Sequence, residues 1–145
     1  MVADESQFQL VTFHLGEELV TIDFDKELNR EQLNEIEYIA NGKVWANLPV
    51  KAYYPSNEEL KNIDYRSKKE IDGAVRLVNI KDTDICACCA PHVAFTGEIG
   101  FIKIVFWQKY KGGVRLFMKA GALGYDEIST CFKTLNKLSA LLSLP

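Results

Sequence analysis

Two segments near the N-terminus alternate hydrophobic and polar residues, as half-buried strands do. They cover residues 9–14 and 19–24, and Gly16 lies between them. In the second segment three apolar residues alternate with a threonine and an aspartate, so the two kinds of side chain fall on opposite faces. The pattern predicts an antiparallel hairpin.

The hydrophobic period then becomes helical. Apolar residues recur every three or four positions from Leu33 to Val44, which predicts a helix over residues 30–46. Asn29 and Gln32 have the spacing of a capping box at the start of this helix.

A second capping box follows at Ser56 and Glu59 and predicts a short helix over residues 57–62. Residues 50–54, which lie between two prolines, have the composition of a short strand. Residues 64–72 mix acidic and basic side chains, which is typical of a solvated turn, with an RNA contact as the alternative.

The most regular pattern in the second half predicts two strands, over residues 101–109 and 114–120. Lys111, Gly112 and Gly113 separate them. Two adjacent glycines permit the positive φ angles of a tight hairpin turn, and they also permit close approach of a ligand to the backbone.

Residues 74–80 predict another strand, and residues 122–144 predict a helix with a leucine stripe. Because strands outnumber helices and short turns join most of them, the expected fold class is α+β, a largely antiparallel sheet with helices packed on one face. We expect one domain over residues 1–121. Residues 122–145 either pack on that domain or connect it to another.

The composition agrees with one globular domain, since 48% of the 145 residues are hydrophobic and 26% are charged. No apolar run reaches the roughly 20 residues that a membrane helix needs. The N-terminus begins with acidic residues where a secretion signal has basic ones, so we expect a cytoplasmic protein.

The net charge of −3 argues against a protein that coats DNA or RNA nonspecifically. Its distribution is uneven, however, because residues 100–124 contain five basic side chains and no acidic one. This run predicts an edge of the fold that attracts RNA. Its members are Lys103, Lys109, Lys111, Arg115 and Lys119.

The candidate chemistry lies in a segment that holds three of the four cysteines. Cys88 and His92 are four positions apart, and Pro91 prevents a regular helix between them, so both side chains can turn toward one ion. Thiolate and imidazole favour zinc, but a zinc site needs about three or four protein ligands. Cys86 is the expected substitute ligand. The alternative is a set of small buried cysteines and a hydrogen-bonded loop histidine.

Several of these motifs together resemble the alanyl-tRNA editing domain, which occurs within alanyl-tRNA synthetases and as free-standing trans-editing proteins. The central match is CACCAPHVAFTGEIGFIKI, preceded by YRSKKEIDGAVRLVNI and followed by KYKGGVRLFMKAG. It extends upstream through FHLGEELVTIDFDKEL and VWANLPV, so the resemblance covers residues 13–121. It implies the threonyl/alanyl-tRNA synthetase editing-domain fold.

The resemblance implies hydrolysis of serine or glycine wrongly attached to alanine tRNA. The family's zinc site combines an H-x-x-x-H pair with a C-x-x-x-H pair, and zinc there can hold the ester and polarise water. Cys88 and His92 match the second pair. The first pair has no match, because residues 1–12 contain no histidine and the only other histidine is His14. We therefore expect an incomplete zinc site, with residues 1–121 as a partial editing domain.

The resemblance also implies that the glycine loop faces the acceptor end of alanine tRNA. The residues expected to contact it are Lys109, Lys111, Gly112, Gly113 and Arg115. No catalytic residue can be assigned from the pattern. Two hypotheses stay open: an editing deacylase or a fragment of one, and a noncatalytic tRNA-binding module that has lost its metal site.

Overall fold

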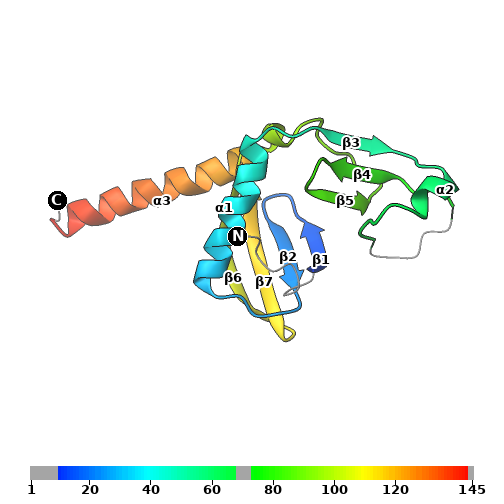
Figure 1. Cartoon of the computed structure of the whole chain (residues 1–145). Coiled ribbons are helices and arrows are strands. Elements are labelled where there is room, and N and C mark those ends of the chain that lie inside the picture. The colour runs from blue at the N-terminus through cyan, green and yellow to red at the C-terminus, as the bar shows by residue number, and fades with distance from the viewer. Residues whose placement is uncertain (1–9, 68–72, 144–145) are drawn as a thin grey trace. The chain divides into compact units, whose positions relative to one another are not determined.

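The computed structural model describes residues 10–67 and 73–143, which divide into two units (Figure 1). The first unit comprises Met1–Gly42 and Gly100–Pro145, and the second comprises Lys43–Ile99. Within the described residues, no helix is long and apolar enough to cross a membrane.

The first unit is built on a four-stranded antiparallel sheet with the strand order β1-β2-β7-β6. Helix α1 contributes to a core on one face of this sheet, where Leu33 packs with Val114 and Leu116 of β7. The strands are β1 (Leu10–Leu15), β2 (Val20–Phe24), β6 (Ile102–Tyr110) and β7 (Gly113–Ala120), and the helices are α1 (Arg30–Trp45) and α3 (Gly121–Leu141).

Helix α1 begins at the predicted capping box. The backbone N–H of Asn29 donates to the side chain of Gln32 at 3.0 Å, and the backbone N–H of Gln32 donates back to Asn29 at 2.9 Å. Further along the helix, the buried Asn41 amide bonds both the N–H and the carbonyl of Ile102, each at 2.8 Å. These bonds fix the start of β6 against α1.

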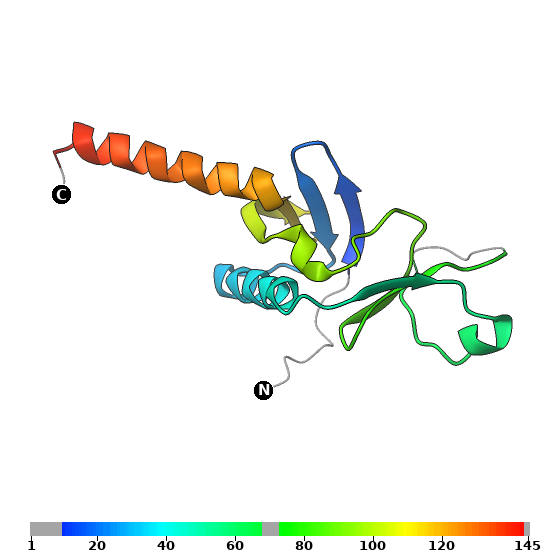
Figure 2. The same cartoon turned by 90° about the horizontal axis from the view of Figure 1, so that it is seen from above.

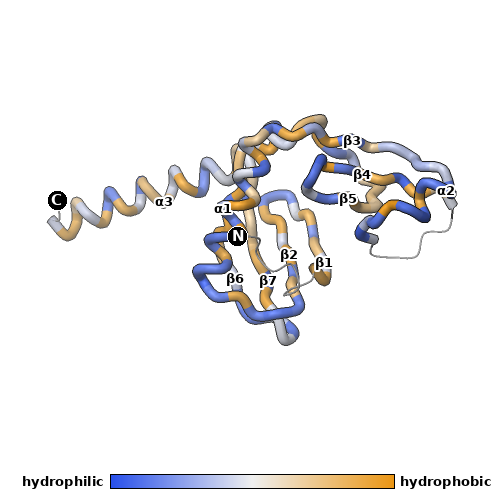
Figure 3. The backbone as a smooth tube through the Cα atoms, viewed as in Figure 1, coloured by the Kyte–Doolittle hydropathy of each residue, from blue (hydrophilic) through white to orange (hydrophobic). Residues whose placement is uncertain are grey.

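Helix α3 follows β7 directly and leaves the sheet (Figures 1 and 2). The stripe predicted to pack or to connect is exposed in this chain, with Leu135 57% and Leu141 80% accessible. Orange and blue segments alternate along the helix in Figure 3, as expected for an amphipathic helix.

The second unit contains a three-stranded antiparallel sheet with the order β3-β4-β5. Its central strand buries Leu77 and Val78, which are adjacent and point to opposite faces. The elements are β3 (Val50–Tyr53), α2 (Asn57–Leu60), β4 (Leu77–Ile80), β5 (Asp84–Ala87) and the 3₁₀ helix η1 (Thr96–Ile99). The capping box of Ser56 and Glu59 is present at the start of α2.

The α+β class and the predicted hairpin of residues 101–109 with 114–120 are confirmed. The strands form two sheets rather than the expected single one, because residues 43–99 pair only among themselves in the described chain. Two parts of the predictions lie outside the described residues: residues 68–72 of the charged segment 64–72, and Gln9, the first residue of the predicted N-terminal strand.

Candidate functional site

The segment that carries Cys88 and His92 leaves β5 and ends at η1, and hydrogen bonds hold it at its downstream end. The buried Thr96 hydroxyl accepts from the N–H of Leu48 at 2.8 Å and donates to the carbonyl of Lys43 at 2.7 Å. The N–H of Val50 donates to the carbonyl of Ala94 at 2.9 Å. The loop therefore returns to a fixed point beside β3.

The upstream end of the loop is held by Arg76, which directly precedes β4. The Cys88 N–H donates to the Arg76 carbonyl at 3.1 Å. In return, Nη1 of Arg76 donates to the carbonyls of Cys88 at 2.8 Å and Ala90 at 2.9 Å. Sequence reasoning missed this residue, because an arginine next to a strand gives no local signal that it binds a loop twelve residues away.

The two candidate ligands differ in exposure, since Cys88 is half-buried and His92 is exposed. Nδ1 of His92 lies 2.8 Å from the Ala90 carbonyl oxygen. Across residues 10–67 and 73–143, no group of three or more His, Cys, Asp or Glu side chains is placed to hold a metal ion. Thiolate and imidazole fit zinc in kind, but two donors do not fit it in number.

Cys86, the expected substitute ligand, lies within β5 opposite Val78. Burial raises the pKa of its thiol, and the nearby Asp84 and Cys88 raise that pKa further, while Arg66 lowers it.

The basic run forms a separate candidate site within the first unit, at the β6–β7 hairpin. Lys111 and Gly112 make a two-residue turn, and both have positive φ angles, of 47° and 82°. Gly113 is the first residue of β7, and a Cβ atom there would lie 1.9 Å from the carbonyl oxygen of Phe24. Its missing side chain therefore makes room for the chain's own backbone in β2.

Arg115 lies opposite Asp23 on the sheet and forms a two-pronged ion pair with it, at 2.6 and 2.7 Å. Its guanidinium also lies 3.7 Å from the ring centre of Tyr110. The hydrogen bonds from Arg115 hold the pKa of the Asp23 carboxyl below its usual range, although burial opposes this shift. The Asp23 side chain is only 6% exposed and that of Arg115 is 27% exposed, so the pair joins a buried carboxylate to a partly exposed guanidinium.

Three other members of the basic run also have acidic partners in the first unit. Lys103 pairs with Glu37 at 2.7 Å, and the exposed Lys109 pairs with Glu27 at 2.9 Å. Lys119 likewise pairs with Glu127. Within the described chain, Lys111 has no ion pair, and its ammonium lies 5.2 Å from the Tyr110 ring centre.

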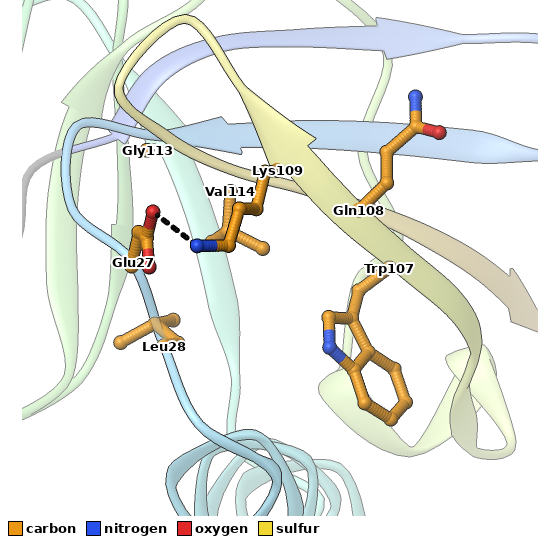
Figure 4. A pocket seen from close by; sticks show the side chains of 7 residues that line it. All are labelled: Glu27, Leu28, Trp107, Gln108, Lys109, Gly113 and Val114. Atoms are coloured by element: carbon orange, nitrogen blue, oxygen red, sulfur yellow. Dashed lines mark ion pairs between the residues drawn. The ribbon is translucent and has the colours of Figure 1, made fainter.

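A pocket of about 270 Å³ lies beside the hairpin, and Figure 4 shows the side chains that line it. The Lys109–Glu27 ion pair crosses it, and the Trp107 ring lies further along the same strand (Figure 4). A second pocket, of about 240 Å³, is lined by Asp23, Tyr110, Lys111 and Arg115 among others. The hairpin thus presents shallow surfaces on which basic and aromatic groups adjoin.

Sequence reasoning found the basic run but missed its acidic partners. One signal was present: Asp23 is a carboxylate inside a strand, on the same face as threonine and opposite the apolar side chains. A charge at such a position requires a partner when that face is covered. The partner is 92 residues away, so its identity was not readable from spacing.

Residues 75–117 match the family described as the threonyl and alanyl tRNA synthetase second additional domain. Similar proteins include the alanine–tRNA ligase of Francisella philomiragia, 32% identical over 81% of this chain and 14% of the relative. The alanine–tRNA ligase of Petrotoga mobilis is 31% identical over 90% of this chain and 14% of the relative. The alanine–tRNA ligase of Halobacterium salinarum is 37% identical over 71% of this chain and 12% of the relative. The chain thus spans about 14% of the length of the first relatives it matches.

Proposed function

We propose, on the premise that residues 75–117 belong to the second additional domain of the threonyl and alanyl tRNA synthetases, that this chain is part of an editing site. The reaction is hydrolysis of the ester that joins serine or glycine to alanine tRNA in the cytoplasm. The observation that carries the proposal is that this one matched segment contains both the Cys88–His92 loop and the β6–β7 turn with Lys109, Lys111 and Arg115.

The proposal gives the Cys88–His92 loop the role of a metal-binding element. Both of its ends are tied down by buried or half-buried hydrogen bonds, whereas Nε2 of His92 has no partner within the described residues. A loop that has a fixed backbone and a free ring nitrogen is preorganised to bind a metal ion. The remaining zinc donors have to come from outside the described residues, for example from an H-x-x-x-H segment.

The hairpin has the role of meeting the acceptor end of the tRNA, and its residues divide into two kinds. Lys109 and Lys111 are exposed, and an exposed ion pair such as Lys109–Glu27 is worth only about 0–1 kcal/mol, so either lysine can exchange to a phosphate. Gly112 presents backbone at the turn. Gly113 and Arg115 shape the hairpin from inside, through β2.

A noncatalytic tRNA-binding module is the second candidate function. The observation in its favour is that the described residues hold two candidate metal donors on the loop and no cluster of three. This hypothesis keeps the hairpin contact and makes the cysteines ordinary packing residues.

The test compares zinc content and deacylation of Ser-tRNA(Ala) in three proteins. They are the 145-residue chain, the same chain extended at its N-terminus by an H-x-x-x-H segment, and the extended chain with Cys88→Ser. The proposal predicts little zinc and little hydrolysis in the first, both in the second, and loss of both in the third. Cys89→Ser is the matched control, since the adjacent exposed thiol has no assigned role.

Equal zinc and equal turnover in the Cys88→Ser protein would contradict the proposed ligand. If the extended chain binds acceptor-stem RNA without hydrolysing Ser-tRNA(Ala), the noncatalytic hypothesis is correct. Stoichiometric zinc and full turnover in the 145-residue chain alone would show that its own residues complete the site.

A further inference from the structure

Arg76 uses its charged group in an unusual way. Its Nη1 donates to two backbone carbonyls, those of Cys88 and Ala90, and its own carbonyl accepts from the Cys88 N–H. In the described chain the Arg76 guanidinium has no ion pair, unlike Arg66 and Arg115. Because the two carbonyls lie two residues apart, one guanidinium sets the orientation of both.

The Ala90 carbonyl is shared with His92, whose Nδ1 lies 2.8 Å away. A carbonyl oxygen only accepts hydrogen bonds, so Nδ1 has to carry the proton. In neutral His92 the lone pair is then on Nε2, the ring nitrogen that faces away from this bond. The imidazole is exposed, and nothing else in the described residues bonds to it.

We propose that Arg76 is a positioning residue that fixes His92 in the Nδ1–H tautomer and so makes Nε2 the ligand atom of the loop. The proposal rests on the proposed function, in which His92 is a metal ligand. A metal-bound histidine usually donates its second ring N–H to a carbonyl or carboxylate, which fixes the tautomer and the ring orientation. Arg76 acts one step further out, because it orients the carbonyl that orients the ring.

A purely structural role for Arg76 makes a different prediction. If its hydrogen bonds only stabilise the loop, replacing Arg76 lowers the unfolding free energy and leaves the tautomer of His92 unchanged. The tautomer is therefore the quantity to measure. His14 serves as an internal reference, because it is the only other histidine, is exposed on β1 and has no side-chain partner in the described residues.

The experiment records long-range ¹H–¹⁵N correlations of both imidazoles in the ¹⁵N-labelled 145-residue chain, about two pH units above the ordinary histidine pKa of about 6.5. The expected result is that His92 has a clearly larger Nδ1–H population than His14, which shows the mixture of a free imidazole. In Arg76→Met the His92 population shifts to the His14 mixture. In Arg76→Lys, which keeps the positive charge but not the planar guanidinium, the shift is partial. Arg66→Lys is the matched control and leaves His92 unchanged.

A His92 spectrum equal to that of His14 in the unmodified chain would overturn the proposal without any variant. Retention of the Nδ1–H form in Arg76→Lys, the milder change, would overturn the role of Arg76 even if Arg76→Met fails to fold. Failure of the proposed function is distinguishable, because an inactive extended chain with a fixed His92 tautomer contradicts the editing role and leaves the positioning role intact.

Discussion

The β6–β7 hairpin and the Cys88–His92 loop are held in different ways, the hairpin by a contact of one of its side chains and the loop by hydrogen bonds to its backbone. In the hairpin, the side chain of Arg115 is engaged inside the fold by Asp23. In the loop, hydrogen bonds hold the backbone, and one nitrogen of His92 has no partner among the residues that the structure describes. The difference teaches that residue type alone does not tell which groups are available to a ligand, since an arginine in a basic run can already be engaged by a buried carboxylate of the same sheet.

The largest expected effect is at Gly113, where the comparison predicts a strictly internal role. An added Cβ would lie 1.9 Å from the backbone of Phe24, which cannot move without disturbing β2. Gly113→Ala should lower the unfolding free energy by about 3 kcal/mol, as measured by urea denaturation. Gly112→Ala is the control: its Cβ meets open space, and only the positive φ angle costs about 1 kcal/mol. Equal losses for the two variants would contradict the internal role.

Next in size is the Asp23–Arg115 pair. Because the Arg115 side chain is 27% exposed, solvent screens this pair, and Asp23→Asn should cost less than the loss of one partner of a fully buried pair but more than the loss of an exposed one. Glu27→Gln, which breaks the exposed Lys109 pair, should cost less than about 1 kcal/mol. If both changes cost the same in urea unfolding, Arg115 is no more internal than Lys109.

The pH dependence of the same pair follows from the lowered pKa of Asp23. A carboxyl whose folded pKa is depressed contributes stability above its unfolded pKa, near 3.9, and loses that contribution as the pH falls through the folded value. The difference in unfolding free energy between the unmodified chain and Asp23→Asn should be constant near neutrality and shrink below about pH 4. A difference that is independent of pH down to about pH 2 would show that Asp23 is not stabilised as a carboxylate.

A smaller effect is expected where the loop is anchored. Thr96→Val keeps the shape of the buried side chain but leaves the Leu48 N–H and the Lys43 carbonyl without their partner, which should cost about 1–2 kcal/mol. Thr83→Val removes an exposed hydroxyl in the β4–β5 turn and serves as the control. Thermal unfolding of the two variants, followed by circular dichroism, checks the prediction; indistinguishable midpoints would mean that Thr96 is not an anchor.

What the sequence predicted well was local. The capping box of Asn29 and Gln32 depends on residues a few positions apart, so spacing was enough to find it. The two glycines located the β6–β7 turn, although its positive φ angles fall on Lys111 and Gly112 and not on Gly113. The division of the strands into two sheets was not predicted, because it depends on which strands pair over long distances.

The candidate site was likewise predicted only in its local features. The pair of Cys88 and His92 and the basic run were visible as residue types. The contacts that decide how these residues act come from Arg76 and Asp23, which lie far from them in sequence or on another strand. Such contacts are set by the tertiary structure, and neither periodicity nor motif spacing encodes them.

The most direct test of the account is the salt dependence of binding to an acceptor-stem RNA of alanine tRNA. Lys109→Ala combined with Lys111→Ala should reduce the slope of log K against log salt by about 1.4–1.8, because each lost phosphate contact removes about 0.7–0.9. Lys133→Ala, on the exposed part of α3, is the control and should leave the slope unchanged. An unchanged slope in the double variant would contradict the claim that this hairpin meets the tRNA.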